Sequence, residues 1–169
     1  CVRRAPENYG SHFALGFFYA QTNQHAKAIP HYEKSRELKP DNLIVYWNLV
    51  VVSDQAHDQE RVTKWSLAAL PLYERRLSLV PDHCNTRVQY ANLLQSAHRP
   101  DHARLALAPL LKKQDLDGSS YYNIACLYVS LADNEDALTM LRRSVSAGFA
   151  QAELFRTDPD LDPLRRMRE

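Results

Sequence analysis

One fourteen-residue pattern occurs twice in this sequence and constrains its fold more than any other feature. The first copy spans residues 28–41 and reads AIPHYEKSRELKPD, and the second spans residues 69–82 and reads ALPLYERRLSLVPD. Both fit the template Ala-[Ile/Leu]-Pro-x-Tyr-Glu-x-x-x-x-Leu-x-Pro-Asp. Because self-similarity over tens of residues is typical of repeat proteins, the pattern predicts an array of stacked structural units.

Composition indicates that these units are helical. The chain has 169 residues, of which 45% are hydrophobic and only 4 are glycine, and no stretch alternates like a half-buried strand. The net charge is +1, so we expect neither nucleic acid nor an anionic membrane surface as a partner. No apolar run approaches the roughly 20 residues of a membrane-spanning helix, so we expect no membrane insertion.

The three cysteines predict free thiols rather than a metal or disulfide site. Cys1, Cys84 and Cys126 are odd in number and show no C-x-x-C spacing. Free thiols suit a reducing compartment, so we expect a cytoplasmic protein. The chain begins at Cys1 without a methionine, which suggests a fragment; a mature lipoprotein, which also begins with cysteine, is the alternative.

A period of repeat length begins at Tyr9. Counting Tyr9 as position 1, six residues fall at positions 7, 8, 11, 20, 24 and 32, namely Leu15, Gly16, Tyr19, Ala28, Tyr32 and Pro40. These are signature positions of a helix–turn–helix unit of about 34 residues, and the sequence resembles the tetratricopeptide-repeat family. The resemblance implies two antiparallel helices per unit, A and B, with small residues where the helices approach closely.

A lead-in over residues 1–8, four such units and a C-terminal cap account for the whole chain, which we therefore interpret as one domain over residues 1–169. The boundaries are 9–42, 43–83, 84–117 and 118–149, with the cap at 150–169. The second unit is seven residues too long, which is close to two helical turns. We expect a lengthened B helix that starts near Asp58; a longer polar loop is the alternative. The predicted fold is an all-α right-handed solenoid.

The later units also resemble C-terminal repeats that are attached to some bacterial signalling proteins, such as nucleotide cyclases and serine/threonine kinases. The residues that carry this likeness are 123–128 (NIACLY), 146–149 (SAGF) and 158–164 (DPDLDPL). This resemblance implies an alternative role, namely a regulatory or oligomerisation module that self-associates.

In tetratricopeptide arrays the A helices line a concave groove, which by resemblance is the candidate binding site here. Repeat register and residue type select nine groove residues: Phe13, Phe17, Trp47, Asn48, Val51, Val88, Asn92, Tyr122 and Cys126. Aromatic and aliphatic groups dominate this set, so we predict a protein or peptide partner that presents an apolar peptide or helix. The alternative interpretation is that tight curvature or the N-terminal segment covers these residues.

No motif indicates catalysis, a cofactor or a metal site. Phosphate-binding glycine loops, nucleophile elbows and paired catalytic carboxylates do not occur in the sequence. The stretch Asp158-x-Asp160-x-Asp162 superficially matches a calcium loop, but its sixth position is Pro163 instead of the required glycine. Turns that begin short helices explain the same residues. The sequence therefore predicts a non-enzymatic interaction scaffold without a cofactor.

Overall fold

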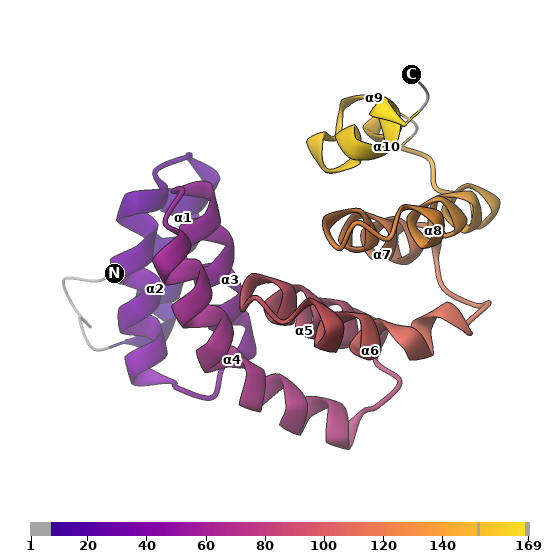
Figure 1. Ribbon diagram of the computed structural model, residues 1–169. Coiled ribbons are helices and arrows are strands. Elements are labelled where there is room, and N and C mark those ends of the chain that lie inside the picture. The colour runs from indigo at the N-terminus through magenta and orange to yellow at the C-terminus, as the bar shows by residue number, and fades with distance from the viewer. Residues whose placement is uncertain (1–7, 152, 168–169) are drawn as a thin grey trace. The chain divides into compact units, whose positions relative to one another are not determined.

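The computed structural model describes residues 8–151 and 153–167, and every regular element within these ranges is a helix (Figure 1). The predicted all-α architecture of helix–turn–helix units is therefore confirmed. The chain divides into two compact units. The first contains the described residues up to Val80 together with Ser96–Arg99, and the second contains Pro81–Gln95 and the described residues from Pro100 onward.

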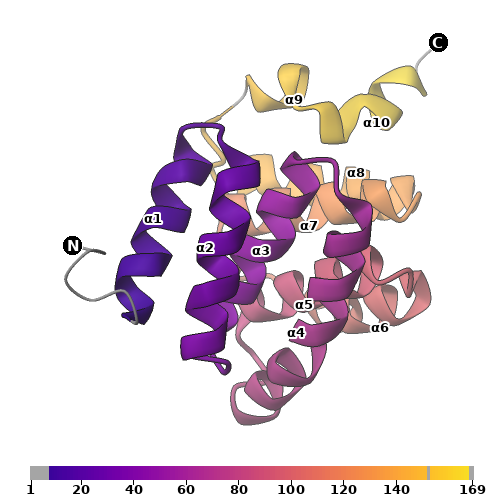
Figure 2. The same ribbon diagram turned by 90° about the vertical axis from the view of Figure 1, so that its left-hand side faces the viewer.

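The first compact unit consists of two helix pairs. Its helices are α1 (Tyr9–Gln21), α2 (His25–Leu38), α3 (Leu43–Gln55) and α4 (Gln59–Leu79). Each helix packs against the next one in sequence, and the four lie side by side in both ribbon views (Figures 1 and 2). The α1–α2 and α3–α4 pairs are the A and B helices of the first two predicted repeats.

The second compact unit contains two further pairs and a C-terminal segment. Its elements are α5 (Cys84–Ser96, its last residue grouping with the first unit), α6 (Pro100–Leu111), α7 (Gly118–Ser130), α8 (Asn134–Ser146), α9 (Leu154–Thr157), the 3-10 turn η1 (Pro159–Leu161) and α10 (Asp162–Arg166). Arg87 joins α5 to α6 through the Ala106 carbonyl, and Arg143 joins α8 to the Leu111 carbonyl. Within the described ranges, no helix combines the length and the apolar character needed to cross a bilayer.

The A helices begin at N-caps that occupy one repeat position. In each case the side chain accepts a hydrogen bond from a backbone amide two or three residues later, at 2.9 to 3.2 Å; the caps are Asn8, Asn42, His83 and Asp117. These caps lie 34, 41 and 34 residues apart. Because Ncap side chains satisfy amides that the helix leaves unpaired, they fix where each repeat starts.

The additional residues of the second repeat lie in its B helix. Helix α4 has 21 residues, whereas α2 has 14. It begins directly after Asp58, whose carboxylate accepts a hydrogen bond from the Arg61 amide at 3.0 Å. Since seven residues are nearly two full turns, the lengthened helix keeps Val62, Trp65 and Ala69 on its buried face.

Close contact between the two helices of a pair explains the small residues of the repeat signature. A Cβ atom added to Gly16 would lie 2.8 Å from the ring of Tyr32, which is 1% exposed. In two repeats, a buried serine on the B helix also donates a hydrogen bond to the backbone carbonyl of the first residue of the A helix. Ser35 donates to the Tyr9 carbonyl at 3.3 Å, and Ser144 donates to the Gly118 carbonyl at 2.7 Å.

Each turn between an A and a B helix contains one residue in the left-handed region. The four residues, with φ between 56° and 60°, are Asn23, His57, His98 and Ala132. Their spacing is again 34, 41 and 34 residues. For residues with a Cβ atom, this conformation costs about 1–2 kcal/mol. The same turn is therefore kept in all four repeats despite its local cost.

Replacement of Ala132 with glycine is expected to raise the free energy of unfolding by about 0.5 kcal/mol. Glycine removes the left-handed strain, and its greater freedom in the unfolded chain offsets part of the gain. Urea denaturation followed by circular dichroism measures the change. Ala108→Gly, at an exposed site inside α6, is the matched control and should destabilise by about 1 kcal/mol. Equal destabilisation by both changes would contradict the strain argument.

Candidate functional site

The first compact unit contains a pocket of about 250 Å³ that coincides with part of the predicted groove. It lies between the carboxyl-terminal turns of α1 and α3. Its lining residues are Phe17, Ala20, Gln21, Asn23, Tyr32, Asn48, Val51, Val52 and Gln55. Three of the nine residues predicted for the groove, Phe17, Asn48 and Val51, therefore lie together in one pocket.

Helix periodicity places these side chains at the pocket. Phe17, Ala20 and Gln21 share one face of α1, and Asn48, Val51 and Gln55 share one face of α3, at spacings of three and four residues. Tyr32 of α2 contributes from beneath and is almost fully buried. The pocket is thus formed by secondary-structure elements, apart from Asn23 in the turn after α1.

Four side-chain amides give the pocket a mostly polar lining. They belong to Gln21, Asn23, Asn48 and Gln55, and none has a hydrogen-bond partner among the residues that the structure describes. By contrast, the Asn42 amide at the start of α3 donates to the hydroxyl of Tyr9 at 3.0 Å. Each free amide offers both donors and an acceptor to a ligand.

Exposed apolar groups accompany these amides. Phe17 is 51% exposed, and Ile44, at the start of α3, is 61% exposed. Phe13 and Trp47 are each half-buried, and the Phe13 ring packs edge-on against Tyr32 with 5.7 Å between ring centroids. All five groove residues predicted in this unit are thus at least partly accessible.

The four groove residues predicted in the second unit are less exposed to solvent, or already hydrogen-bonded, compared with those of the first unit. Val88 is 6% exposed and Tyr122 is 5% exposed. Asn92 uses its amide to donate to the carbonyl of Val88, four residues earlier on the same helix, at 3.2 Å. Cys126 is half-buried. As a set, these four side chains are therefore less exposed than the five groove residues of the first unit, and their part in binding stays a prediction.

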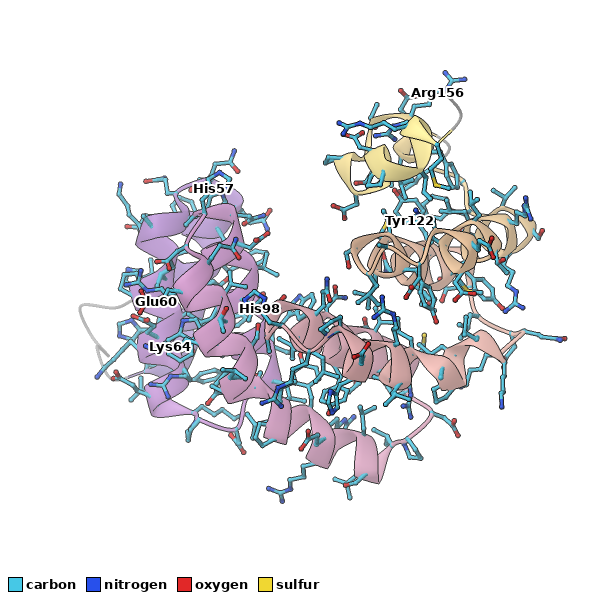
Figure 3. All side chains as sticks on the ribbon, in the orientation of Figure 1. His57, Glu60, Lys64, His98, Tyr122 and Arg156 are labelled. Atoms are coloured by element: carbon cyan, nitrogen blue, oxygen red, sulfur yellow. The ribbon has the colours of Figure 1, made fainter. Side chains whose placement is uncertain are left out.

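The C-terminal segment causes the burial of Tyr122. The Tyr122 ring stacks on Phe149, with centroids 4.7 Å apart, and meets Phe155 edge-on at 5.7 Å. Its hydroxyl donates to a carboxylate oxygen of Asp158 at 2.6 Å. Figure 3 shows Tyr122 on the side of α7 that faces this segment. The segment after Gly148 thus caps the last helix pair, as expected at the end of a solenoid.

A thiol and two carboxylates also meet beneath this segment. Ligand atoms of Cys126, Asp158 and Asp160 lie within 4.8 Å of one another. Burial, and then the two neighbouring carboxylates, raise the pKa of Cys126 to about 12, so the thiol stays protonated at neutral pH. Asp158 already accepts hydrogen bonds from Tyr122 and from the amide of Asp160. These bonds give the cluster a structural role in holding the cap.

Sequence reasoning missed three of the four amides that line the pocket, namely Gln21, Asn23 and Gln55. A signal for two of them was present, because Gln21 and Gln55 both occupy position 13 of their repeats, at the end of the A helix. To predict Asn23 as a lining residue would have required the geometry of the turn, because its φ of 56° directs the chain around the pocket.

Comparisons with known proteins agree with the helical-repeat architecture. Two segments match family models described as tetratricopeptide repeat, residues 10–42 and residues 118–147. A search of curated proteins found no match.

Three solved structures illustrate the likeness. The crystal structure of MamA is 15% identical, with a TM-score of 0.58 over 90% of this chain and 85% of that one. The MamA structure designated MSR-1 C2 is 23% identical, with a TM-score of 0.51 over 86% and 79%. YrrB, described as a TPR protein with an unusual peptide-binding site, is 15% identical, with a TM-score of 0.43 over 93% and 95%. At these identities the MamA structures support the fold alone.

Proposed function

Because this chain is a tetratricopeptide-repeat protein, with one matching segment in each compact unit, we propose that it is a non-catalytic scaffold that binds a peptide segment of a partner protein. The binding site in this proposal is the groove face of α1 and α3, comprising Phe13, Phe17, Trp47, Asn48 and Val51. The compartment in this proposal is the cytoplasm.

One observation carries the proposal: free side-chain amides lie next to accessible aromatic and aliphatic groups in the same pocket. Amides such as Asn48 pair well with the backbone N–H and C=O groups of an extended or helical segment. Phe17 and Val51 provide apolar contact for its side chains. Buried aromatic anchors beside polar groups are typical of the energetically dominant part of an interface.

The proposal is tested by selecting binders from a random peptide display library with the native chain. The selected peptides are then measured against the double variant Phe17→Ala with Asn48→Ala. We expect the double variant to bind at least about 10-fold more weakly, since removal of a central anchor typically costs more than 1 kcal/mol. Fluorescence anisotropy gives the dissociation constants, and circular dichroism verifies folding.

Leu105→Ala is the matched control because Leu105 is 72% exposed on α6, outside the proposed site. It should leave peptide affinity unchanged. If the selected peptides bind the folded double variant as tightly as the native chain, the proposed site is wrong. Light scattering of the free chain adds a separate outcome: a dimer that dissociates in the double variant would identify a second copy as the occupant.

A further inference from the structure

The pocket between α1 and α3 also has a particular electrostatic character, whereas the groove predicted from the sequence was described only by its apolar and amide groups. None of its nine lining side chains carries a charge. Lys27, which follows the turn after α1, is engaged elsewhere, because its ammonium donates to Gln24 at 2.7 Å and lies 5.8 Å from the Tyr19 ring centroid. The lining itself therefore contributes no formal charge to the field in the pocket.

Two helices end at this pocket. Helix α1 ends at Gln21 and helix α3 ends at Gln55, and both residues line it. The carboxyl-terminal end of a helix carries the equivalent of up to about half a negative charge, because the peptide dipoles align along the helix axis. The last turn of neither helix contains a basic residue to offset it. Two negative helix ends thus converge on one small space.

Asp54 does not line the pocket, but it adds a full negative charge on α3 beside the lining residue Gln55. It directly precedes Gln55 and lies one turn after Val51, on the exposed surface of α3. Its one recorded side-chain contact is a long hydrogen bond of 3.4 Å from the amide of Gln59. Within the described residues, no lysine, arginine or histidine forms an ion pair with it.

These features select among possible occupants. A carboxylate would face Asp54 and two helix ends without a cation to pair with, which is unfavourable. A purely apolar group would remove the four amides from water without supplying partners, at about 1–3 kcal/mol for each unsatisfied group. A cation would meet amide oxygens, the helix ends, a carboxylate and the accessible face of Phe17, which favours cation–π contact.

The volume of the pocket limits the size of the group that can enter it. At about 250 Å³ it is smaller than the roughly 300–1,000 Å³ typical of sites for drug-sized molecules. It suits one long side chain better than a whole ligand. We propose that the pocket receives a lysine or arginine side chain of the partner, while the rest of the partner segment lies along the groove face; this inference rests on the proposed function.

The test uses the ¹⁵N-labelled full chain and small probes in place of the unknown partner. The first probe is N-acetyl-L-arginine amide, and N-acetyl-L-lysine amide is the second. N-acetyl-L-norleucine amide supplies a similar length without charge, and N-acetyl-L-glutamate amide supplies the opposite charge. The NMR signals followed are the side-chain NH₂ groups of Gln21, Asn23, Asn48 and Gln55.

We expect the two cationic probes to shift these side-chain signals in a saturable manner that added salt weakens. The norleucine and glutamate probes should shift them far less. Asp54→Asn should weaken the cationic probes at least about threefold, because it removes the one full charge at the site. Asp41→Asn, an exposed acid in the turn after α2, is the matched control and should have no effect.

Three results would overturn the inference: equal shifts from norleucine and arginine, stronger shifts from glutamate, or no shift of the four amides by any probe. An unchanged affinity in Asp54→Asn would also contradict it. The peptide selection described above does not depend on these probes. If the peptide selection succeeds and the titration with small probes fails, the proposal of peptide binding is retained. Only the proposal that a basic side chain enters the pocket is then rejected.

Discussion

Raising the pH above about 10 is expected to unfold this chain steeply, because burial raises the pKa of four tyrosines, which keep their hydroxyl groups protonated in the folded chain. Tyr32 and Tyr73 are each 1% exposed in the first unit, and Tyr122 and Tyr128 are 5% and 2% exposed in the second. Burial raises the pKa of Tyr32 and of Tyr128 to about 12. Burial also raises the pKa of Tyr73, and burial together with the hydrogen bond to Asp158 raises that of Tyr122.

The direction of the effect follows from proton binding. In the unfolded chain these tyrosines ionise near pH 10, whereas in the folded chain they keep their protons to higher pH. Above pH 10 the unfolded state binds fewer protons, so rising pH favours it. Each buried tyrosine then removes about 1.4 kcal/mol of stability per pH unit until its folded pKa is reached. Two tyrosines per compact unit give about 3 kcal/mol per pH unit.

A titration between about pH 9 and pH 12 measures this loss, with far-ultraviolet circular dichroism for helix content and tyrosinate absorbance for ionisation. Part of the absorbance change should coincide with unfolding. Tyr32→Phe keeps the ring against Gly16 and should reduce the slope by about 1.4 kcal/mol per pH unit. Ionisation of all nine tyrosines in one step near pH 10, with the helices intact, would contradict the burial argument.

The helical architecture was predictable from sequence because repeat signatures are local. Tyr32 and Tyr73 occupy the same place in the two copies of the fourteen-residue pattern, and both are fully buried. The length of α4 could also be predicted from the sequence. Seven extra residues are close to two helical turns, so they keep the same face of the helix buried if they are themselves helical. Periodicity along one helix was sufficient for these conclusions.

The accessible part of the groove was not predictable in the same way. Whether a groove residue is exposed depends on segments that are distant in sequence and do not repeat. Tyr122 and Phe13 occupy equivalent repeat positions, yet Tyr122 is covered by Phe149 and Phe155, whereas Phe13 stays partly exposed. The polar lining between α1 and α3 is only partly accessible to repeat position. Gln21 and Gln55 share position 13 of their repeats, whereas the contribution of Asn23 depends on the geometry of the turn.

Tyr122→Ala is expected to destabilise the second compact unit by about 3–5 kcal/mol, the usual cost of truncating a large buried aromatic side chain. The ring packs against both Phe149 and Phe155, and its hydroxyl holds Asp158. Tyr122→Phe keeps the ring and loses only the hydrogen bond, so about 1–3 kcal/mol is expected. Urea denaturation measures both changes, and proteolysis near Gln151 reports on release of the C-terminal segment.

Gly118→Ala tests the same contact from the other side. An added Cβ atom would lie 2.8 Å from the backbone nitrogen of Phe149, so the C-terminal segment must move to accommodate it. We expect faster cleavage near Gln151 in this variant and in Tyr122→Ala, and a smaller increase in Tyr122→Phe. If Tyr122→Ala is no less stable than Tyr122→Phe, ring packing does not hold the cap. In that case the groove face of α7 opens readily, and Cys126 should then react with thiol reagents as fast as an exposed cysteine.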